Sequence, residues 1–347
     1  MAEENDKSKI TYEHLAALED DFDDVDTVIL QVRQQYKLTK PLYKKRQSVI
    51  SRMNHSERFW PLVFEQAPVE IETFIQHSDS AILSEALRGL EVSRFELDTN
   101  GDDNTDHTAG EPRSLLIKFE FKENEWFEDK VLEKKFWYRH AKDGWTGLIS
   151  EPVKIHWKKG KDLSQGLTDD AFALFKAREK AGDMMKKDLP EYKALTKKAE
   201  SWTGANTSFF TWFGYVSARR FISAEESAKA VKEAAERREK RNKGDLVEEP
   251  TVDEESNDED AEVHPSGEEL ALAIAEEVWP QATKLFTQAQ DMQDEELSDD
   301  DFEDGDAENG DTRGDEEEEE TIDIRSLVKG KDKGDENGGP PKKKQKK

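Results

Sequence analysis

Apolar and aromatic side chains recur at alternating intervals of three and four residues along the first sixty residues of the chain. The series comprises Leu15, Leu18, Phe22, Val25, Ile29, Val32, Tyr36, Thr39, Tyr43, Arg46, Ile50 and Met53. A sustained period of 3.5 residues is typical of a coiled coil, so the sequence predicts one long helix over residues 11–57. At about 1.5 Å per residue this helix would measure roughly 70 Å, and we expect a second copy of the chain to cover it.

The apolar members of this series are the predicted dimer contacts: Leu15, Leu18, Phe22, Val25, Ile29, Val32, Tyr36, Tyr43 and Ile50. Thr39 and Arg46 interrupt the series, and Pro41 lies beside it. A proline inside a helix removes a hydrogen bond and usually kinks the axis, so a bend is expected near Thr39–Pro41. The alternative is a helix that packs in a bundle with its own chain, but no second helix of this length is predicted downstream.

Shorter elements follow, and they indicate an α+β fold. Period-2 alternation with β-branched and aromatic residues predicts four half-buried antiparallel strands, at Leu90–Leu97, Ser114–Lys122, Val131–His140 and Val153–Trp157. Helices are predicted at Ser56–Glu65, Ser78–Gly89, Asp169–Ala181, Pro190–Ala199, Ser223–Lys243 and Gly267–Ala289, of which Ser223–Lys243 is almost wholly polar and expected to be exposed. The aromatic run Phe209–Phe213 is interpreted as core.

The charge is concentrated at the end of the chain. The whole chain has a formal net charge of −28, and from Asp245 onward there are 36 acidic against 11 basic residues. We therefore expect residues 1–10 to be disordered, residues 58–289 to form the folded domain, and residues 290–339 to be a disordered acidic tail. A field of this sign attracts basic proteins and repels nucleic acid, so we expect no direct, sequence-specific DNA binding. The simplest alternative is a tail that only confers solubility.

Residues 340–347 close the chain with a basic cluster. Lys342, Lys343, Lys344, Lys346 and Lys347 predict a nuclear localisation signal, and hence a nuclear protein that also shuttles with the cytoplasm. No apolar run reaches the eighteen residues of a membrane span, so no membrane association is expected. Ser298, before three aspartates, and Ser256, before Asn-Asp-Glu, resemble acceptors of acidophilic kinases.

Enzymatic functions have little support in the sequence. The chain has no cysteine, and its seven histidines form no His-Glu-x-x-His pair. Neither a phosphate-binding Gly-x-x-x-x-Gly-Lys loop nor a Gly-x-Ser-x-Gly elbow occurs, and we expect no catalytic residues, no cofactor and no metal. Glu96–His107 echoes a calcium loop but ends in histidine where such a loop requires glutamate, which disfavours a calcium buffer.

Six motifs in one order resemble the nucleosome assembly protein family of histone chaperones, in particular its SET (template-activating factor) branch with its fungal relatives. They are Leu38–Arg46, Phe59-Trp60 with Pro68, Glu123–Leu132, Ile155–Leu163, Ser208–Phe213, and Glu276–Pro280 running into Asp291–Glu296. The resemblance implies a homodimer joined by long antiparallel helices, with an "earmuff" domain on each protomer that binds core histones on its acidic underside. Relative to that pattern, residues 167–206 and 214–266 are insertions.

The resemblance also implies which residues bind histones, chiefly the histone-3/histone-4 pair. They are the paired acids before Trp-Pro and the carboxylates leading into the tail: Glu276, Glu277, Asp291, Asp294, Glu295, Glu296, Asp299, Asp300 and Asp301. The predicted function is a histone chaperone that shields core histones and promotes nucleosome assembly. The alternative is a dimeric scaffold that stimulates or targets a histone acetyltransferase through Leu167–Asn206 or Ser223–Lys243.

Overall fold

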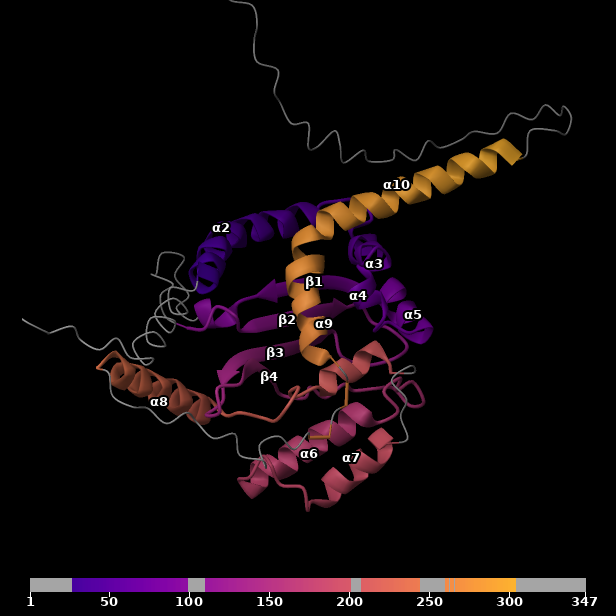
Figure 1. The fold of residues 1–347 in the computed structure, drawn as a ribbon. Helices are drawn as coiled ribbons and strands as arrows, with labels where there is room; N and C mark the ends of the chain where they lie inside the picture. The colour runs from indigo at the N-terminus through magenta and orange to yellow at the C-terminus, as the bar shows by residue number, and fades with distance from the viewer. Residues whose placement is uncertain are drawn as a thin grey trace, which may run out of the picture. The chain divides into compact units, whose positions relative to one another are not determined.

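The computed structural model describes residues 27–98, 110–200, 207–243, 260–261, 263–264 and 266–303. By its contacts the chain divides into two units, Met1–Ser298 and Asp299–Lys347, and the described elements belong to the first unit except for the last five residues of the final helix. The predicted α+β class is confirmed: helices surround one antiparallel sheet (Figure 1). Within the described ranges no helix combines the length and apolarity needed to cross a membrane.

The sheet has four strands in the order β1-β2-β3-β4, each antiparallel to the next. Their bounds are β1 Leu87–Ser93, β2 Leu115–Phe121, β3 Val131–His140 and β4 Thr146–Ser150. The second and third predicted strands are confirmed. The first begins earlier than expected, and Phe95–Leu97 is a 3-10 turn instead of its end.

The fourth predicted strand is wrong, because Val153–Trp157 makes only an isolated bridge between Trp157 and Phe127. The Val153 N–H donates to the carbonyl of Phe213, at 2.7 Å, outside the sheet. The observed fourth strand, β4, lies just before Val153, and Gly147 interrupts the apolar alternation that would have predicted it. A Cβ at Gly147 would lie 2.6 Å from the Trp145 ring, so a larger residue there would have to displace that ring.

The hydrophobic core lies on one face of the sheet. Alternate residues of β2 are buried, and the Phe119 ring contacts rings of Phe64, Phe209, Trp212 and Phe213. The predicted core run is a buried 3-10 turn, Phe209–Gly214. Its start is fixed by the fully buried Asp79, which accepts hydrogen bonds from the Ser208 hydroxyl at 2.6 Å and the Phe209 N–H at 2.7 Å.

Short helices cover the start of the sheet. A 3-10 turn, Ser56–Arg58, leads into α3 (Phe59–Glu65), and α4 (Val69–Glu72) and α5 (His77–Glu85) follow. The helix predicted at Ser78–Gly89 therefore ends earlier than expected. The later helices α6 (Leu167–Ala181), α7 (Pro190–Glu200) and α8 (Ala224–Asn242) confirm their predictions closely.

Two long helical segments frame the candidate site. α2 (Thr27–Ile50) ends seven residues before the predicted bound, because a turn follows and His55 adopts a left-handed backbone with φ 54°. α2 continues through Pro41 and is curved over its length (Figure 1). α9 (Gly267–Ala273), a π-helical turn (Ile274–Val278) and α10 (Trp279–Glu303) form the second segment.

Candidate functional site

The junction of α9 and α10 is a bend that carries two adjacent glutamates. The Trp279 N–H bonds to the carbonyl of Ile274, five residues back, as in a π-helix. Pro280 follows and has no backbone N–H, so the carbonyl of Glu276 loses its α-helical donor. A π-turn next to a proline accounts for the angle between α9 and α10 (Figure 1).

Glu276 and Glu277 lie within this turn, between buried anchors. Ile274 and Val278 are fully buried, whereas the Glu276 side chain is 58% exposed. Glu277 is half-buried, and none of the ion pairs between described residues includes it. Because π-turns in helices are frequent at functional sites, this turn is a candidate site on local geometry alone.

The sequence predicted the two glutamates but missed the cation beside them. Arg94, directly after β1, places Nη2 3.8 Å from Glu276 Oε1, and its Nη1 donates to the Pro112 carbonyl at 2.6 Å. The Arg94 side chain is only 17% exposed. Burial lowers the pKa of Arg94 and the Glu276 charge opposes that shift, but an arginine remains protonated at neutral pH.

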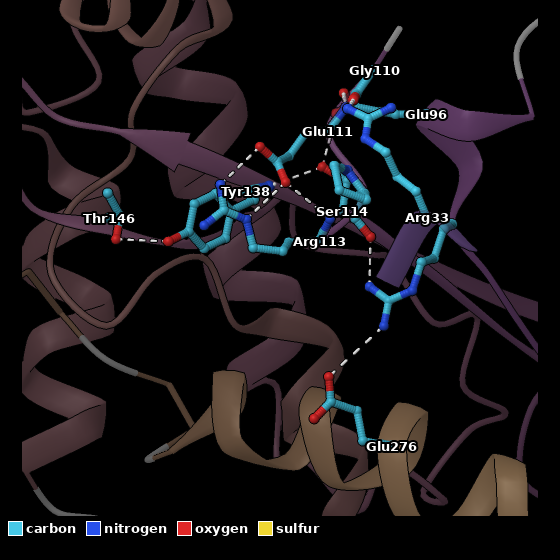
Figure 2. Close-up of polar contacts among 11 residues, drawn as sticks. Arg33, Glu96, Gly110, Glu111, Arg113, Ser114, Tyr138, Thr146 and Glu276 are labelled. Carbon is cyan, nitrogen blue, oxygen red and sulfur yellow. Dashed lines mark hydrogen bonds and ion pairs between the residues drawn. The ribbon is translucent and has the colours of Figure 1, made fainter. Parts of the chain in front are cut away.

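A hydrogen-bond network joins Glu96 to Glu111 and Ser114 and fixes the residues on either side of Pro112 (Figure 2). Glu96 accepts from the Glu111 N–H at 3.0 Å and from the Ser114 hydroxyl at 2.9 Å. Glu111 in turn forms a two-pronged pair with Arg113, at 2.8 and 3.0 Å. Pro112 lies between Glu111 and Arg113, so the carbonyl that accepts the Arg94 hydrogen bond is held in place.

A cavity of about 380 Å³ opens between α2, β1 and the bend. Its walls are mainly apolar and aromatic, and its charged side chains are Arg94 and Glu276. Within the described ranges no cluster of three His, Asp or Glu side chains is suited to a metal ion. The arrangement therefore offers the exposed carboxylate of Glu276 to a cationic partner.

The predicted seam of α2 faces the chain's own domain. The Tyr36 hydroxyl donates to Asp98 at 2.6 Å, and the Tyr43 ring lies 5.1 Å from the Trp279 ring. Arg46 donates to the Trp279 carbonyl at 2.5 Å and stacks 4.2 Å from the Trp279 ring, and burial lowers its pKa to about 10.

Part of the predicted seam is covered within one chain, because Tyr36 and Ile50 are buried, and Ile29, Val32 and Tyr43 half-buried. The dimer contacts themselves stay a prediction. A hydrophobic period predicts that a face is covered but does not say by which residues. Leu38, Leu42 and Val49 form an exposed stripe on another face of α2, and Leu30 is also exposed but lies about 80–120° away from them around the helix.

The remaining predicted residues fall in three places. Asp291 lies on α10, is exposed and interacts with a neighbouring group. Within the bounds of α10 lie Asp294, Glu295, Glu296, Ser298, Asp299, Asp300 and Asp301. Outside the described residues lie Leu15, Leu18, Phe22, Val25, Ser256 and the five lysines of residues 342–347.

Comparison with known proteins identifies one family. The family described as "Nucleosome assembly protein (NAP)" matches residues 10–289. A putative nucleosome assembly protein of Schizosaccharomyces pombe is 33% identical over 44% of this chain and 59% of its own length. Protein SET of Drosophila melanogaster is 34% identical over 43% of this chain and 50% of its own. The chain thus spans about half to three fifths of the length of these curated relatives.

Solved structures align over most of the chain at low identity. The crystal structure of Vps75 covers 81% of this chain and is itself covered completely, with a TM-score of 0.46 and 19% identity. The crystal structure of Ccp1 covers 80% of this chain and 95% of its own, with a TM-score of 0.45 and 24% identity.

Proposed function

The chain belongs to the nucleosome assembly protein family, and on that premise we propose that it is a histone chaperone that shields core histones and promotes nucleosome assembly. The family is non-enzymatic, so the proposal requires no catalytic group. The observation that carries it is the π-turn, where Glu276 and Glu277 stand at a bend at the start of the helix that leads into the most acidic part of the chain.

The chemistry is a competition for cationic side chains. Core histones carry many lysines and arginines that DNA phosphates otherwise capture in nonspecific complexes. Exposed carboxylates compete for these charges, and each exposed ion pair contributes only about 0–1 kcal/mol. Affinity must therefore come from many simultaneous contacts. Because each contact is weak, DNA that wraps the histones correctly can replace the contacts one by one and bind the histones instead.

A homodimer would double the number of such contacts. We infer that the dimer uses the exposed stripe of α2, Leu38, Leu42 and Val49, in addition to any seam residues that precede Thr27. This stripe is rotated by roughly a third of a turn from the seam, since one residue advances the helix by about 100°. Large apolar side chains that remain exposed along one helix face favour an interaction surface over solvent.

The test is a histone-binding titration of the full chain against a chain truncated after Met292, at several salt concentrations. Truncation removes most of the carboxylates of the acidic tail, so we expect weaker binding and a shallower dependence on salt. The remaining, less salt-sensitive binding should fall further with Glu277→Gln. Lys284→Gln, a charge change on the exposed face of α10, is the control. Histone binding that is absent in the full chain would refute the function.

Several finer features belong to this proposal as well. We propose a preference for the histone-3/histone-4 pair, nuclear import through the lysines of residues 342–347, and phosphorylation at Ser298 and Ser256. Competition between the two histone pairs tests the first. Import of a reporter with these lysines changed to glutamine tests the second, and mass spectrometry after treatment with an acidophilic kinase tests the third.

The alternative function, a scaffold for an acetyltransferase, is supported by the helices α6 and α7, which form a folded pair within the described part of the insertion, residues 167–200. α6 and α7 pack around a small core of Leu167, Ala171, Leu174, Leu195 and Val263. Arg178 on α6 donates two hydrogen bonds to Asp260, of 2.5 and 2.9 Å, and these bonds give the α6–α7 pair a fixed shape. If the α6–α7 pair is the surface to which the acetyltransferase docks, truncation after Met292 will weaken histone binding and leave stimulation of the enzyme intact.

A further inference from the structure

We propose that Arg94 is an internal competitor for the Glu276 carboxylate, so that Glu277 is the stronger histone contact of the pair. The inference rests on the proposed histone-chaperone function and assigns unequal roles within its carboxylate pair. It follows from the placement of one cation that the linear sequence does not reveal.

The Arg94 guanidinium is close to Glu276 but is not hydrogen-bonded to it. The separation of 3.8 Å between Nη2 and Oε1 exceeds the usual 2.7–3.2 Å of an N–H···O bond. Their interaction is therefore mainly coulombic. The bend itself is anchored by the fully buried Ile274 and Val278, so the Arg94–Glu276 contact is not what holds the helix in place.

Arg94 is also unable to move aside easily. Its Nη1 bonds to the Pro112 carbonyl at 2.6 Å, and Glu96 fixes both sides of Pro112 through Glu111 and Ser114. The side chain lines the cavity under α2 and is only 17% exposed. A histone cation that approaches Glu276 must therefore share it with a fixed positive charge.

Glu277 has no such competitor. It occupies the same π-turn, and no ion pair between described residues includes it. A histone lysine or arginine that pairs with Glu277 therefore meets an uncompensated carboxylate. The two neighbouring glutamates, equivalent in sequence, differ in their tertiary surroundings: Glu276 is 58% exposed and lies beside Arg94, whereas Glu277 is half-buried and lies beside no cation of a described ion pair.

The experiment measures core-histone affinity of the full chain with Arg94→Gln, Glu276→Gln, their double variant, and Glu277→Gln. We expect R94Q to bind about two- to fivefold more tightly than the wild type at low salt, as for release of one exposed ion pair. The gain should vanish in the E276Q background and fade at high salt. E277Q should weaken binding more than E276Q does.

Arg88→Gln is the matched control. Arg88 lies on β1, the strand that Arg94 directly follows, and its guanidinium donates to the carbonyls of Leu87 and Glu85. Both substitutions remove one positive charge, so the difference between them isolates the position next to Glu276. Thermal melting followed by circular dichroism checks that each variant is folded.

Equal effects of R94Q and R88Q, or a gain from R94Q that survives in E276Q, would overturn the inference. If R94Q fails to fold, the comparison of E276Q with E277Q decides alone, and equal losses would overturn it. If the wild-type chain binds no histones, the proposed function itself is refuted. If the wild type binds histones but E276Q and E277Q lose the same affinity, only the role of Arg94 is refuted.

Discussion

The exposed stripe of α2 allows the strongest test of how two chains associate. Leu38 and Leu42 are 60% and 61% exposed. Full burial of a leucine side chain contributes about 1.5–3 kcal/mol, so covering these exposed parts contributes about 1–2 kcal/mol for each residue. A symmetric dimer contains four such side chains, which amounts to about 4–7 kcal/mol when all are covered.

Leu38→Gln combined with Leu42→Gln removes this contribution without adding charge. Since about 1.4 kcal/mol changes a binding constant tenfold, the dimer dissociation constant should rise by roughly a thousand- to a hundred-thousandfold. Light scattering coupled to size-exclusion chromatography, at several protein concentrations, reports the mass. We expect the variant to elute as a monomer at concentrations where the wild type is a dimer.

Two comparison variants make the result specific. Val69→Gln changes an exposed apolar residue on α4, which is 67% exposed and should leave the dimer intact. Ile50→Ala changes a buried seam residue and should lower the melting temperature without dissociating the dimer. If Leu38→Gln/Leu42→Gln remains a dimer while Ile50→Ala becomes a monomer, the seam is the interface and our assignment is wrong.

Three further predictions concern the folded domain. Phe119→Ala should lower the free energy of unfolding by about 3–5 kcal/mol, because Phe119 is fully buried among aromatic rings; urea denaturation measures this. Asp260→Ala leaves the buried Arg178 without its carboxylate and should loosen α6 and α7, seen as faster amide exchange there than in the sheet. Burial, and then the nearby Arg113, lower the pKa of His140 below 6.5. His140 therefore binds a proton more readily in the unfolded chain than in the folded one. Its contribution to the free energy of unfolding is present above about pH 6.5 and is lost as the pH falls through the pKa of the folded state. His140→Gln should reduce this loss in chemical-denaturation curves between pH 7 and 5, and an unchanged pH dependence would contradict the assignment.

Local patterns were sufficient for most of the secondary structure. Alternation along β2 and β3 and the helical periods of α6 and α7 depend on neighbours within a few residues, and these predictions agree with the structure. The helix predicted at Gly267–Ala289 is instead divided into α9, the π-turn and α10, which extends to Glu303. The failure at Val153–Trp157 has a tertiary cause, because that backbone bonds to the aromatic turn at Phe213 rather than to a strand. Alternation indicates burial on one side and does not identify the bonding partner.

Lys134 illustrates the same limit in the core. It occupies an inward position of β3 between Leu132 and Phe136 and is fully buried. Its ammonium donates to the carbonyls of Glu151, Phe213 and Tyr215, at 3.1, 3.1 and 2.8 Å. A lysine is unfavourable inside a protein unless such acceptors surround it, and they come from segments up to 81 residues away.

The sequence by itself determined the fold class and the acidic end of the chain, and its family resemblance predicted the two glutamates before Trp279-Pro280 as histone contacts. Only the tertiary structure decided that the α2 seam packs on its own domain, that these glutamates stand in a π-turn, and that Arg94 lies beside one of them. The physical reason is that periodicity and charge show that a segment must be buried or will repel like charges, but not which residues it contacts. Those contacting residues lie far apart in the chain and meet only on folding.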